Sequence, residues 1–211
     1  MDKPNVIEKF NTAIFVEEFC QVITPIVGRV ETIYEIGSLD GDDARRMRPY
    51  FPDAEVFVFE ALKENYERYL KDDETLITFN VAISDTDGEA TFYEKETNGI
   101  HSIHDRGGVG KSYTVATRRL DSIIEEYNLP QPEVMKIDVE GASIEVLRGM
   151  GKYLDGVRAI HLETEDYPYF QGEVLHDEVC KYLEEKGFIL VQINKNKVDD
   201  NGHQYDTIWV K

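Results

Sequence analysis

Two sets of ionisable side chains have the types and spacing to do chemistry. The first set crowds a glycine loop and consists of Glu35, Asp40, Asp42 and Asp43. Gly37 and Gly41 let the backbone of this loop approach a ligand closely, with positive φ angles. A pyrophosphate placed there would meet like charge, whereas a cationic sulfonium would be attracted. The loop therefore predicts a nucleotide-like ligand that carries positive charge.

The second set follows two apolar strands further along the chain. Its members alternate along the sequence: Lys136, Asp138 and Glu140 in one strand and its exit, and His161, Glu163 and Glu165 in the other. Side chains with a period of two share one face of a strand, and ionisable groups at such positions are costly unless they are paired or functional. They predict a functional site, which on a substrate hydroxyl could act by removing the proton.

Two mechanisms fit this second set. In the first, His161 or one of the carboxylates Asp138, Glu140 and Glu163 acts as a general base. In the second, Asp138 and Glu163 share a divalent cation, Mg²⁺ or Mn²⁺, which lowers the pKa of the hydroxyl. We favour the metal-free mechanism.

The elements that must position these residues alternate between strands and helices. Strands are predicted over Thr32–Ile36, Glu55–Glu60, Leu76–Ile83, Glu133–Val139 and Val157–Thr164, and an antiparallel hairpin over Phe188–Ile193 and Tyr205–Val210. Helices are predicted over Asp42–Phe51, Lys63–Leu70, Leu120–Tyr127, Ala142–Leu154 and Glu173–Lys186. Near-continuous apolar strands are typical of a parallel sheet covered on both faces. We therefore expect an α/β fold with a seven-stranded, mostly parallel sheet.

The N-terminal and middle segments depart from this alternation. Residues 1–31 are predicted to form a helical segment packed on a domain of residues 32–211. Its helix spans Val6–Val27, ends at Pro25 and Gly28, and has Val6, Phe10, Ile14 and Ile23 as core contacts. Gly88–Tyr93 and Tyr113–Thr117 read as further strands, and Thr97–Lys111 as a long loop that is functional or mobile.

Composition excludes several classes of protein. The 211 residues suffice for one α/β domain, and the net charge of −19 disfavours binding to nucleic acids or anionic membranes. No stretch approaches the roughly 20 apolar residues of a membrane span. Glu8, Glu17 and Glu18 interrupt the apolar N-terminal positions, which is unlike a signal peptide. Cys20 and Cys180 lack metal-ligand spacing, which indicates the reduced thiols of a cytoplasmic protein.

Four sequence segments, in order and with matching spacing, carry a family resemblance. They are Tyr34–Gly41 (YEIGSLDG), Val56–Glu60 (VFVFE), Asn80–Asp85 (NVAISD, followed by Gly88 and Phe92-Tyr93) and Lys136–Gly141 (KIDVEG). Together, from about residue 32 to residue 165, the chain resembles the FkbM family of S-adenosylmethionine-dependent methyltransferases. The chain departs from the family at Leu39, Ala61 and Ser143, where Asn, Pro and Glu are frequent.

The resemblance implies a class I methyltransferase (Rossmann-like) fold and roles for individual residues. The cofactor-binding positions would be Glu35, Gly37, Ser38, Asp40, Gly41, Glu60, Ala61, Asn80, Ala82 and Asp138, and the substrate-side positions His101 and Ser102. Glu60 would accept hydrogen bonds from both ribose hydroxyls. Glu35 or Asp40 would hold the methionine ammonium or orient the loop.

The implied activity is methyl transfer from S-adenosylmethionine to a hydroxyl, preferably of a sugar or glycan, or of another small molecule. One alternative is a nucleotide-binding oxidoreductase of the NAD type. The dinucleotide fingerprint G-x-G-x-x-G argues against it, since Leu39 and Asp42 occupy the second and third glycine positions. The other alternative is a methyltransferase-fold binding module without catalysis. The sequence leaves the oligomeric state open.

Overall fold

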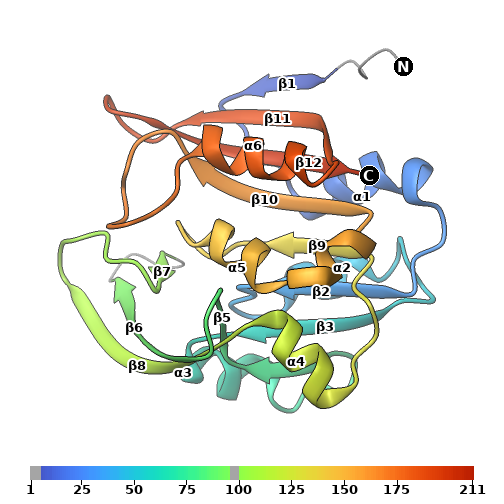
Figure 1. The fold of residues 1–211 in the computed structure, drawn as a ribbon, viewed down its shortest axis with the longest axis horizontal. Coiled ribbons are helices and arrows are strands. Elements are labelled where there is room, and N and C mark those ends of the chain that lie inside the picture. Colours follow the sequence, from blue (N-terminus) through green and yellow to red (C-terminus); the bar gives the residue numbers. More distant parts are fainter. Residues whose placement is uncertain (1–5, 96–99) are drawn as a thin grey trace.

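The computed structural model describes residues 6–95 and 100–211, and their central feature is an eight-stranded sheet. Its order is β1 (Ile7–Phe10), β11 (Ile189–Lys197), β12 (His203–Val210), β10 (Ala159–Glu165), β9 (Val134–Ile137), β2 (Thr32–Ile36), β3 (Glu55–Glu60) and β4 (Ile77–Asn80) (Figure 1). β12 runs antiparallel to both of its neighbours, and the other described neighbours pair in parallel. The predicted fold class and the C-terminal hairpin are therefore confirmed.

Helices cover both faces of this sheet. They are α1 (Val16–Val27), α2 (Asp42–Met47), α3 (Lys63–Asn65) with the π-helical turn η1 (Tyr66–Leu70), α4 (Leu120–Tyr127), α5 (Ser143–Gly149) with the 3₁₀ turn η2 (Gly151–Gly156), and α6 (His176–Glu185). Successive residues of β2 enter different cores, because strand side chains alternate between faces. Ile33 belongs to the buried cluster that contains Phe19 of α1, and Tyr34 to the cluster that contains Leu147 of α5.

The strand count differs from the expected seven because the first part of the predicted N-terminal helix is a strand. β1 pairs in parallel with β11, and all four of its residues are exposed. Phe10 is 66% exposed and Val6 is also exposed, so neither is a core contact, whereas Ile14 and Ile23 are buried as predicted. The open edge of β11 offers backbone hydrogen bonds, which a search for apolar periodicity does not record.

The end of the N-terminal helix also needs a correction. Pro25 lies inside α1 rather than at its end. Gly28, with φ +62°, ends the helix, and its N–H donates to the Thr24 carbonyl. Only a residue without Cβ adopts this conformation easily, so the glycine was the more reliable end signal.

The predicted strand Leu76–Ile83 is divided at Val81: its first part belongs to the large sheet, and its last two residues begin a second sheet. Its order is β5 (Ala82–Ile83), β8 (Gly110–Arg118), β6 (Gly88–Lys95) and β7 (His101–Ser102). Figure 1 shows this small sheet beside one end of the large sheet. Of the predicted loop Thr97–Lys111, residues 97–99 lie outside the described part; the rest includes β7 and the start of β8.

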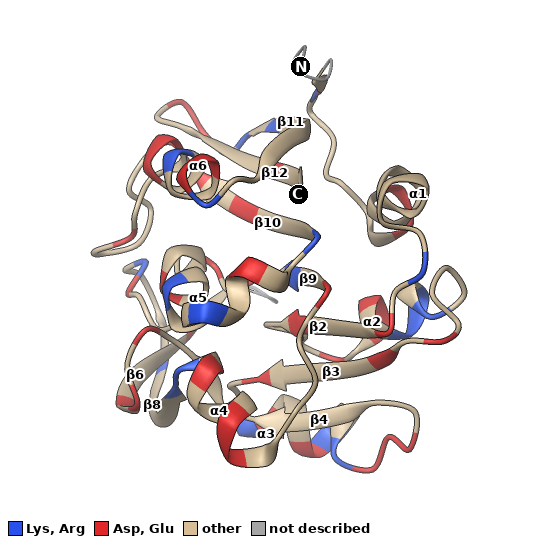
Figure 2. Cartoon of the chain, turned by 45° about the vertical axis from the view of Figure 1, so that its right-hand side comes forward, with Lys and Arg blue, Asp and Glu red and all other residues tan. Residues whose placement is uncertain are grey.

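Acidic residues occur in several helices, including α1, α4 and α6 (Figure 2). On α6, for example, Asp177, Glu178, Glu184 and Glu185 are all exposed. Much of the negative charge is thus solvated surface. Among the described residues, the helices are too short or too polar to cross a membrane.

Candidate active site

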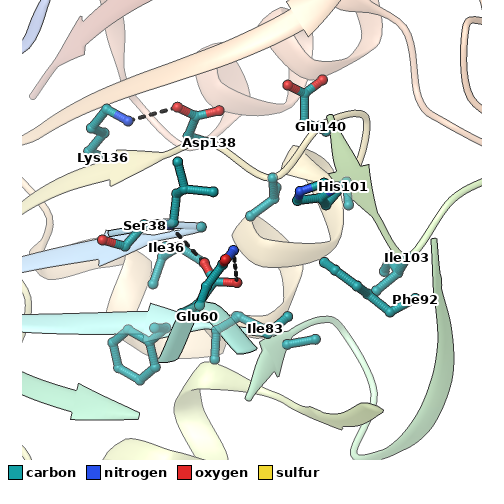
Figure 3. A pocket seen from close by; sticks show the side chains of 18 of the residues that line it. Ile36, Ser38, Glu60, Ile83, Phe92, His101, Ile103, Lys136, Asp138 and Glu140 are labelled. Carbon is teal, nitrogen blue, oxygen red and sulfur yellow. Dashed lines mark hydrogen bonds and ion pairs between the residues drawn. The ribbon is translucent and has the colours of Figure 1, made fainter. Parts of the chain in front are cut away.

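A pocket of about 480 Å³ lies at the carboxyl ends of the central parallel strands. Ile36 of β2, Glu60 of β3 and Glu163 of β10 line it, and Phe92 and His101 close it from the small sheet (Figure 3). Ligands of open α/β sheets bind at this edge. The structure thus brings the glycine loop and the second set of carboxylates into one cavity.

The glycine loop passes directly over the end of β9. A Cβ atom on Gly37 would lie 1.8 Å from the carbonyl oxygen of Asp138, and one on Gly41 would lie 2.8 Å from Leu70 of η1. Gly37, Leu39 and Gly41 all have positive φ, of +79°, +57° and +78°. Gly37 is therefore required by close packing against the backbone as well as by its conformation, and Gly41 chiefly by its conformation.

Glu35 lies behind the loop rather than in the pocket. It is 1% exposed, and Ser38 Oγ donates a hydrogen bond of 2.9 Å to its Oε2. Burial raises the pKa of Glu35 to about 8, although the nearby Lys136 charge opposes this. Of the two roles that the sequence allowed, this position suits orientation of the loop.

Lys136 ties the two sets of residues together. Its side chain is buried, and Nζ lies 2.8 Å from Asp138 Oδ2 and 3.1 Å from Asp43 Oδ2. Burial alone would lower the pKa of Lys136, but the charges of Asp138, Glu35 and Asp43 raise it. The lysine stays charged and joins the end of β9 to the first turn of α2.

Glu60 is held by the backbone on both sides. Its Oε2 accepts the Leu39 N–H at 2.8 Å and its Oε1 accepts the Leu62 N–H at 2.8 Å. The side chain is 5% exposed, and burial raises its pKa against these hydrogen bonds. A carboxylate has about four acceptor sites, so lone pairs remain for a ligand in the pocket.

The other cofactor positions named from the sequence fall in different places. Ser38, Asp40, Ala61, Ala82 and Asp138 line the pocket together with Gly37, whereas Gly41 does not line it. Asn80 instead donates from Nδ2 to the carbonyl oxygens of Glu60 and Ala61, at 2.8 and 3.1 Å, and so fixes the end of β3. Sequence reasoning missed the lining residues Asn65, Val81 and Ile103, which no local pattern marks.

Three carboxylates meet on the other side of the pocket. Oxygens of Asp138, Glu140 and Glu163 lie within 4.8 Å of one another. Burial would raise the pKa of Asp138, but Lys136 holds it below its usual range. Burial, with the Asp138 charge second, raises the pKa of Glu140 to about 8 and also raises that of Glu163.

Two further acidic residues, Glu165 and Glu173, border this cluster. Glu163 Oε1 and Glu173 Oε2 are buried without a hydrogen-bond partner among the described residues. Glu165 is 5% exposed, and burial followed by the Glu173 charge raises its pKa to about 8. These groups have acceptor capacity that the protein leaves unused.

His161 does not line the pocket. It is 5% exposed, its ring centroid lies 5.3 Å from that of Phe19 in α1, and Nε2 is 3.6 Å from Asp206 Oδ1. It thus packs under α1, two residues before Glu163 in β10. His101 lines the pocket, whereas Ser102 beside it is 2% exposed and bonds to the carbonyl of Glu140.

The donor set fits a hard divalent cation only in part. Carboxylate oxygens at this spacing are suitable ligands. However, the Lys136 ammonium already contacts Asp138. A cation bound to Asp138 would sit beside that positive charge, which weakens the electrostatic case for it.

Comparison with known proteins agrees with this geometry. The sequence matches the methyltransferase FkbM domain over residues 35–190. Hexuronic acid methyltransferase AglP of Haloferax volcanii is 31% identical over 150 residues, which cover 65% of this chain and 61% of AglP. The 2-O-methyltransferase NoeI of Sinorhizobium fredii is 27% identical over 173 residues, 73% of this chain and 71% of NoeI. The match to AglP thus spans less than two thirds of that protein.

A solved structure supports the fold. TrmK of M. capricolum, determined with S-adenosylhomocysteine, superposes with a TM-score of 0.54 at 7% identity, covering 95% of this chain and 69% of TrmK. It shares the class I, Rossmann-like architecture. The family match covers the glycine loop, Glu60 and the carboxylate cluster, and extends beyond the four segments first recognised. The chain belongs to the FkbM methyltransferase family.

Proposed function

We propose that the chain transfers a methyl group from S-adenosylmethionine to a hydroxyl of a sugar or glycan. The observation that carries this proposal is one pocket with two unlike sides. The cofactor half comprises the glycine loop 37–41 and Glu60. The acceptor half comprises Asp138, Glu140 and Glu163. The names of AglP and NoeI, a hexuronic acid methyltransferase and a 2-O-methyltransferase, support the sugar as acceptor.

The cofactor half has the groups that S-adenosylmethionine requires. Glu60, fixed by two backbone N–H groups, can accept both ribose hydroxyls. Val81, Ile83 and Phe92 supply apolar surface for an adenine ring. Asp40 and Asp43 give the loop a negative potential that favours a sulfonium cation. When bound, the cofactor supplies an electrophilic methyl carbon.

The acceptor half has the groups that remove a proton. Methyl transfer requires a hydroxyl oxygen in line with the methyl carbon, and its proton must pass to a base. Asp138 has a lowered pKa because of Lys136, so it is a weak base and suits orientation of the hydroxyl. Glu163 has a raised pKa and an oxygen without a partner among the described residues, so we assign it as the general base.

The test begins with calorimetry on the wild-type protein. We expect binding of S-adenosylmethionine and S-adenosylhomocysteine and none of NAD. Binding of NAD alone would favour the oxidoreductase alternative and end this proposal. A panel of glycans and small hydroxyl compounds, read by mass spectrometry for the gain of one methyl, then identifies the acceptor. Binding of the cofactor without turnover on any acceptor would favour a binding module.

The metal alternative has its own test. We expect turnover to persist in EDTA, because the base and its orienting partner are both side chains of this chain. Loss of turnover in EDTA, restored by Mg²⁺ or Mn²⁺, would instead assign Asp138 and Glu163 as ligands.

A further inference from the structure

Glu140 has a backbone conformation that is unusual for a residue with a side chain. Its φ is +47°, and Gly141 follows at +77°. The left-handed region is disfavoured for residues other than glycine and persists only where the surroundings hold it. This turn directly after β9 places the Glu140 carboxylate in the pocket, near Asp138 (Figure 3). Something must therefore hold the turn.

Ser102 of β7 makes the contact that does so. Its Oγ donates a hydrogen bond of 2.5 Å to the carbonyl oxygen of Glu140 and accepts the N–H of His104 at 3.0 Å. A hydroxyl has one proton to donate. Since that proton goes to Glu140 and the side chain is 2% exposed, Ser102 has no donor left for an acceptor substrate.

The segment around Ser102 is itself fixed at several points. Ser102 pairs with Tyr93 of β6, and His104 Nε2 lies 3.1 Å from Glu145 Oε1 on α5. At the next residue, a Cβ on Gly141 would lie 2.7 Å from the Phe170 ring. The turn is thus closely packed at Gly141 and hydrogen-bonded at Glu140.

We propose that Ser102 is a positioning residue: it holds the left-handed turn at Glu140, and thereby the Glu140 carboxylate, in the acceptor half of the pocket. It does this without contacting the acceptor. The expected kinetic consequence rests on the proposed function. The structural coupling between Ser102 and Glu140 does not. It replaces the substrate-contact role that the sequence suggested for Ser102.

A double-mutant cycle tests the kinetic consequence. Ser102→Ala should lower kcat about 10- to 50-fold, with the acceptor KM and the cofactor Kd changed less than twofold. In a Glu140→Ala background, the same Ser102→Ala change should alter kcat less than about twofold, because there is no carboxylate left to position. If the two substitutions instead lower kcat independently, so that their effects multiply, and the acceptor KM rises, Ser102 contacts the acceptor directly and the proposal is overturned. Unchanged kcat in the single variant would overturn it too.

A matched control separates positioning from general loss of packing. Thr207 Oγ1 has the same hydrogen-bond pattern, since it donates to the Leu162 carbonyl and accepts the Trp209 Nε1–H, but it lies within the sheet outside the pocket. Thr207→Val should lower Tm and leave kcat within about twofold. Ser102→Thr, which keeps the hydroxyl, should recover most of the kcat lost in Ser102→Ala.

Thermal unfolding tests the coupling without any acceptor. Ser102→Ala should lower Tm by about 3–6 °C in the wild type and by less than half of that in a Glu140→Gly background, since glycine adopts the turn without strain. Equal Tm shifts in the two backgrounds would overturn the proposal. If the wild type binds no S-adenosylmethionine but the Tm shifts are coupled, the proposed function fails and the positioning contact stands.

Discussion

The two halves of the pocket satisfy their polar groups in opposite ways. In the cofactor half, the Glu60 carboxylate accepts two backbone N–H groups, and the backbone of the loop is fixed by glycines. In the acceptor half, Glu163 has a buried oxygen without a partner among the described residues, and Glu140 sits in a strained conformation. The Glu60 carboxylate is held in place before a ligand arrives, whereas the acceptor half has a buried oxygen without such support and carboxylates that repel one another.

This difference indicates which property each half serves. A preorganised site binds its ligand with little rearrangement, which suits a cofactor that is the same for every member of the family. Crowded carboxylates with raised pKa values are unfavourable for stability but are the groups that proton transfer requires. We therefore expect substitutions in the first half to change folding and binding, and those in the second half to change turnover.

The largest effect should come from Gly37→Ala. The added Cβ would lie 1.8 Å from the Asp138 carbonyl oxygen, a backbone atom that cannot move away without disrupting β9. We expect a loss of about 4 kcal/mol or more in the free energy of unfolding, together with loss of cofactor binding. Gly28→Ala is the control, since Gly28 also has positive φ but nothing lies within 4 Å of its Cβ position. It should cost only about 1–3 kcal/mol, from the backbone conformation alone.

Glu163→Gln addresses the acceptor half. If Glu163 takes the proton of the hydroxyl, kcat should fall about 10²- to 10³-fold while the cofactor Kd stays within about threefold. The amide keeps the size of the side chain but cannot accept the proton. Single-turnover kinetics and calorimetry separate the two quantities. A large change in the cofactor Kd with a normal kcat would contradict the assignment of Glu163 to the acceptor half.

Glu60→Gln is the reciprocal change in the cofactor half. Loss of charge should weaken binding of S-adenosylmethionine by about 1.5–3 kcal/mol, because hydrogen bonds to a charged carboxylate are stronger than those to an amide. The effect on kcat at saturating cofactor should be small. Glu55→Gln, at the exposed start of the same strand, should have no effect on Kd. Equal affinities for Glu60→Gln and wild type would remove Glu60 from the cofactor site.

The smallest effect is a pH dependence that originates behind the cofactor half. The pKa of Glu35 is raised from its ordinary value of 4.5 to about 8 by burial, so the folded state holds this proton more tightly than the unfolded state. Its stabilisation is complete below pH 4.5 and is lost as pH rises through 8. Chemical denaturation from pH 5 to 9 should therefore show falling stability.

A variant isolates the contribution of Glu35. Glu35→Gln keeps an acceptor for Ser38 and does not titrate, so the stability of this variant should fall less steeply with pH. The two slopes should differ by at most about 1.4 kcal/mol per pH unit. Glu140, Glu163 and Glu165 also have raised pKa values and contribute to the same slope in both proteins. Identical slopes for the two proteins would show that Glu35 is ionised throughout.

The cofactor half was largely readable from the sequence because its features are local. A glycine loop after an apolar strand, and an acidic residue at the end of the next strand, lie within short segments whose spacing is fixed. Gly37 and Glu60 line the pocket, and Gly41 does not, although it has the positive φ expected of the loop. Asn80 does not line it either, because the strand that carries it ends there and its amide bonds to the neighbouring backbone instead.

The acceptor half depends on contacts between distant segments, which spacing does not reveal. Period-two alternation placed His161 and Glu163 on one face, but α1 covers that face at His161 and leaves it open at Glu163. Similarly, nothing in the sequence showed that Ser102 would meet the carbonyl of Glu140, 38 residues away. Strand β1 escaped prediction for the same reason, since its partner β11 is distant in sequence.

The small sheet has a further consequence for the shape of the pocket. The chain enters it after Val81 and leaves it at Arg118, and these ends lie side by side because Ile83 pairs with Arg118 and Ser84 N–H donates to the Arg118 carbonyl. An excursion with adjacent ends can be lengthened, shortened or exchanged at low entropic cost. A change of length between these ends would therefore alter the wall of the pocket that carries Phe92 and His101, while the glycine loop and Glu60 stay on the large sheet.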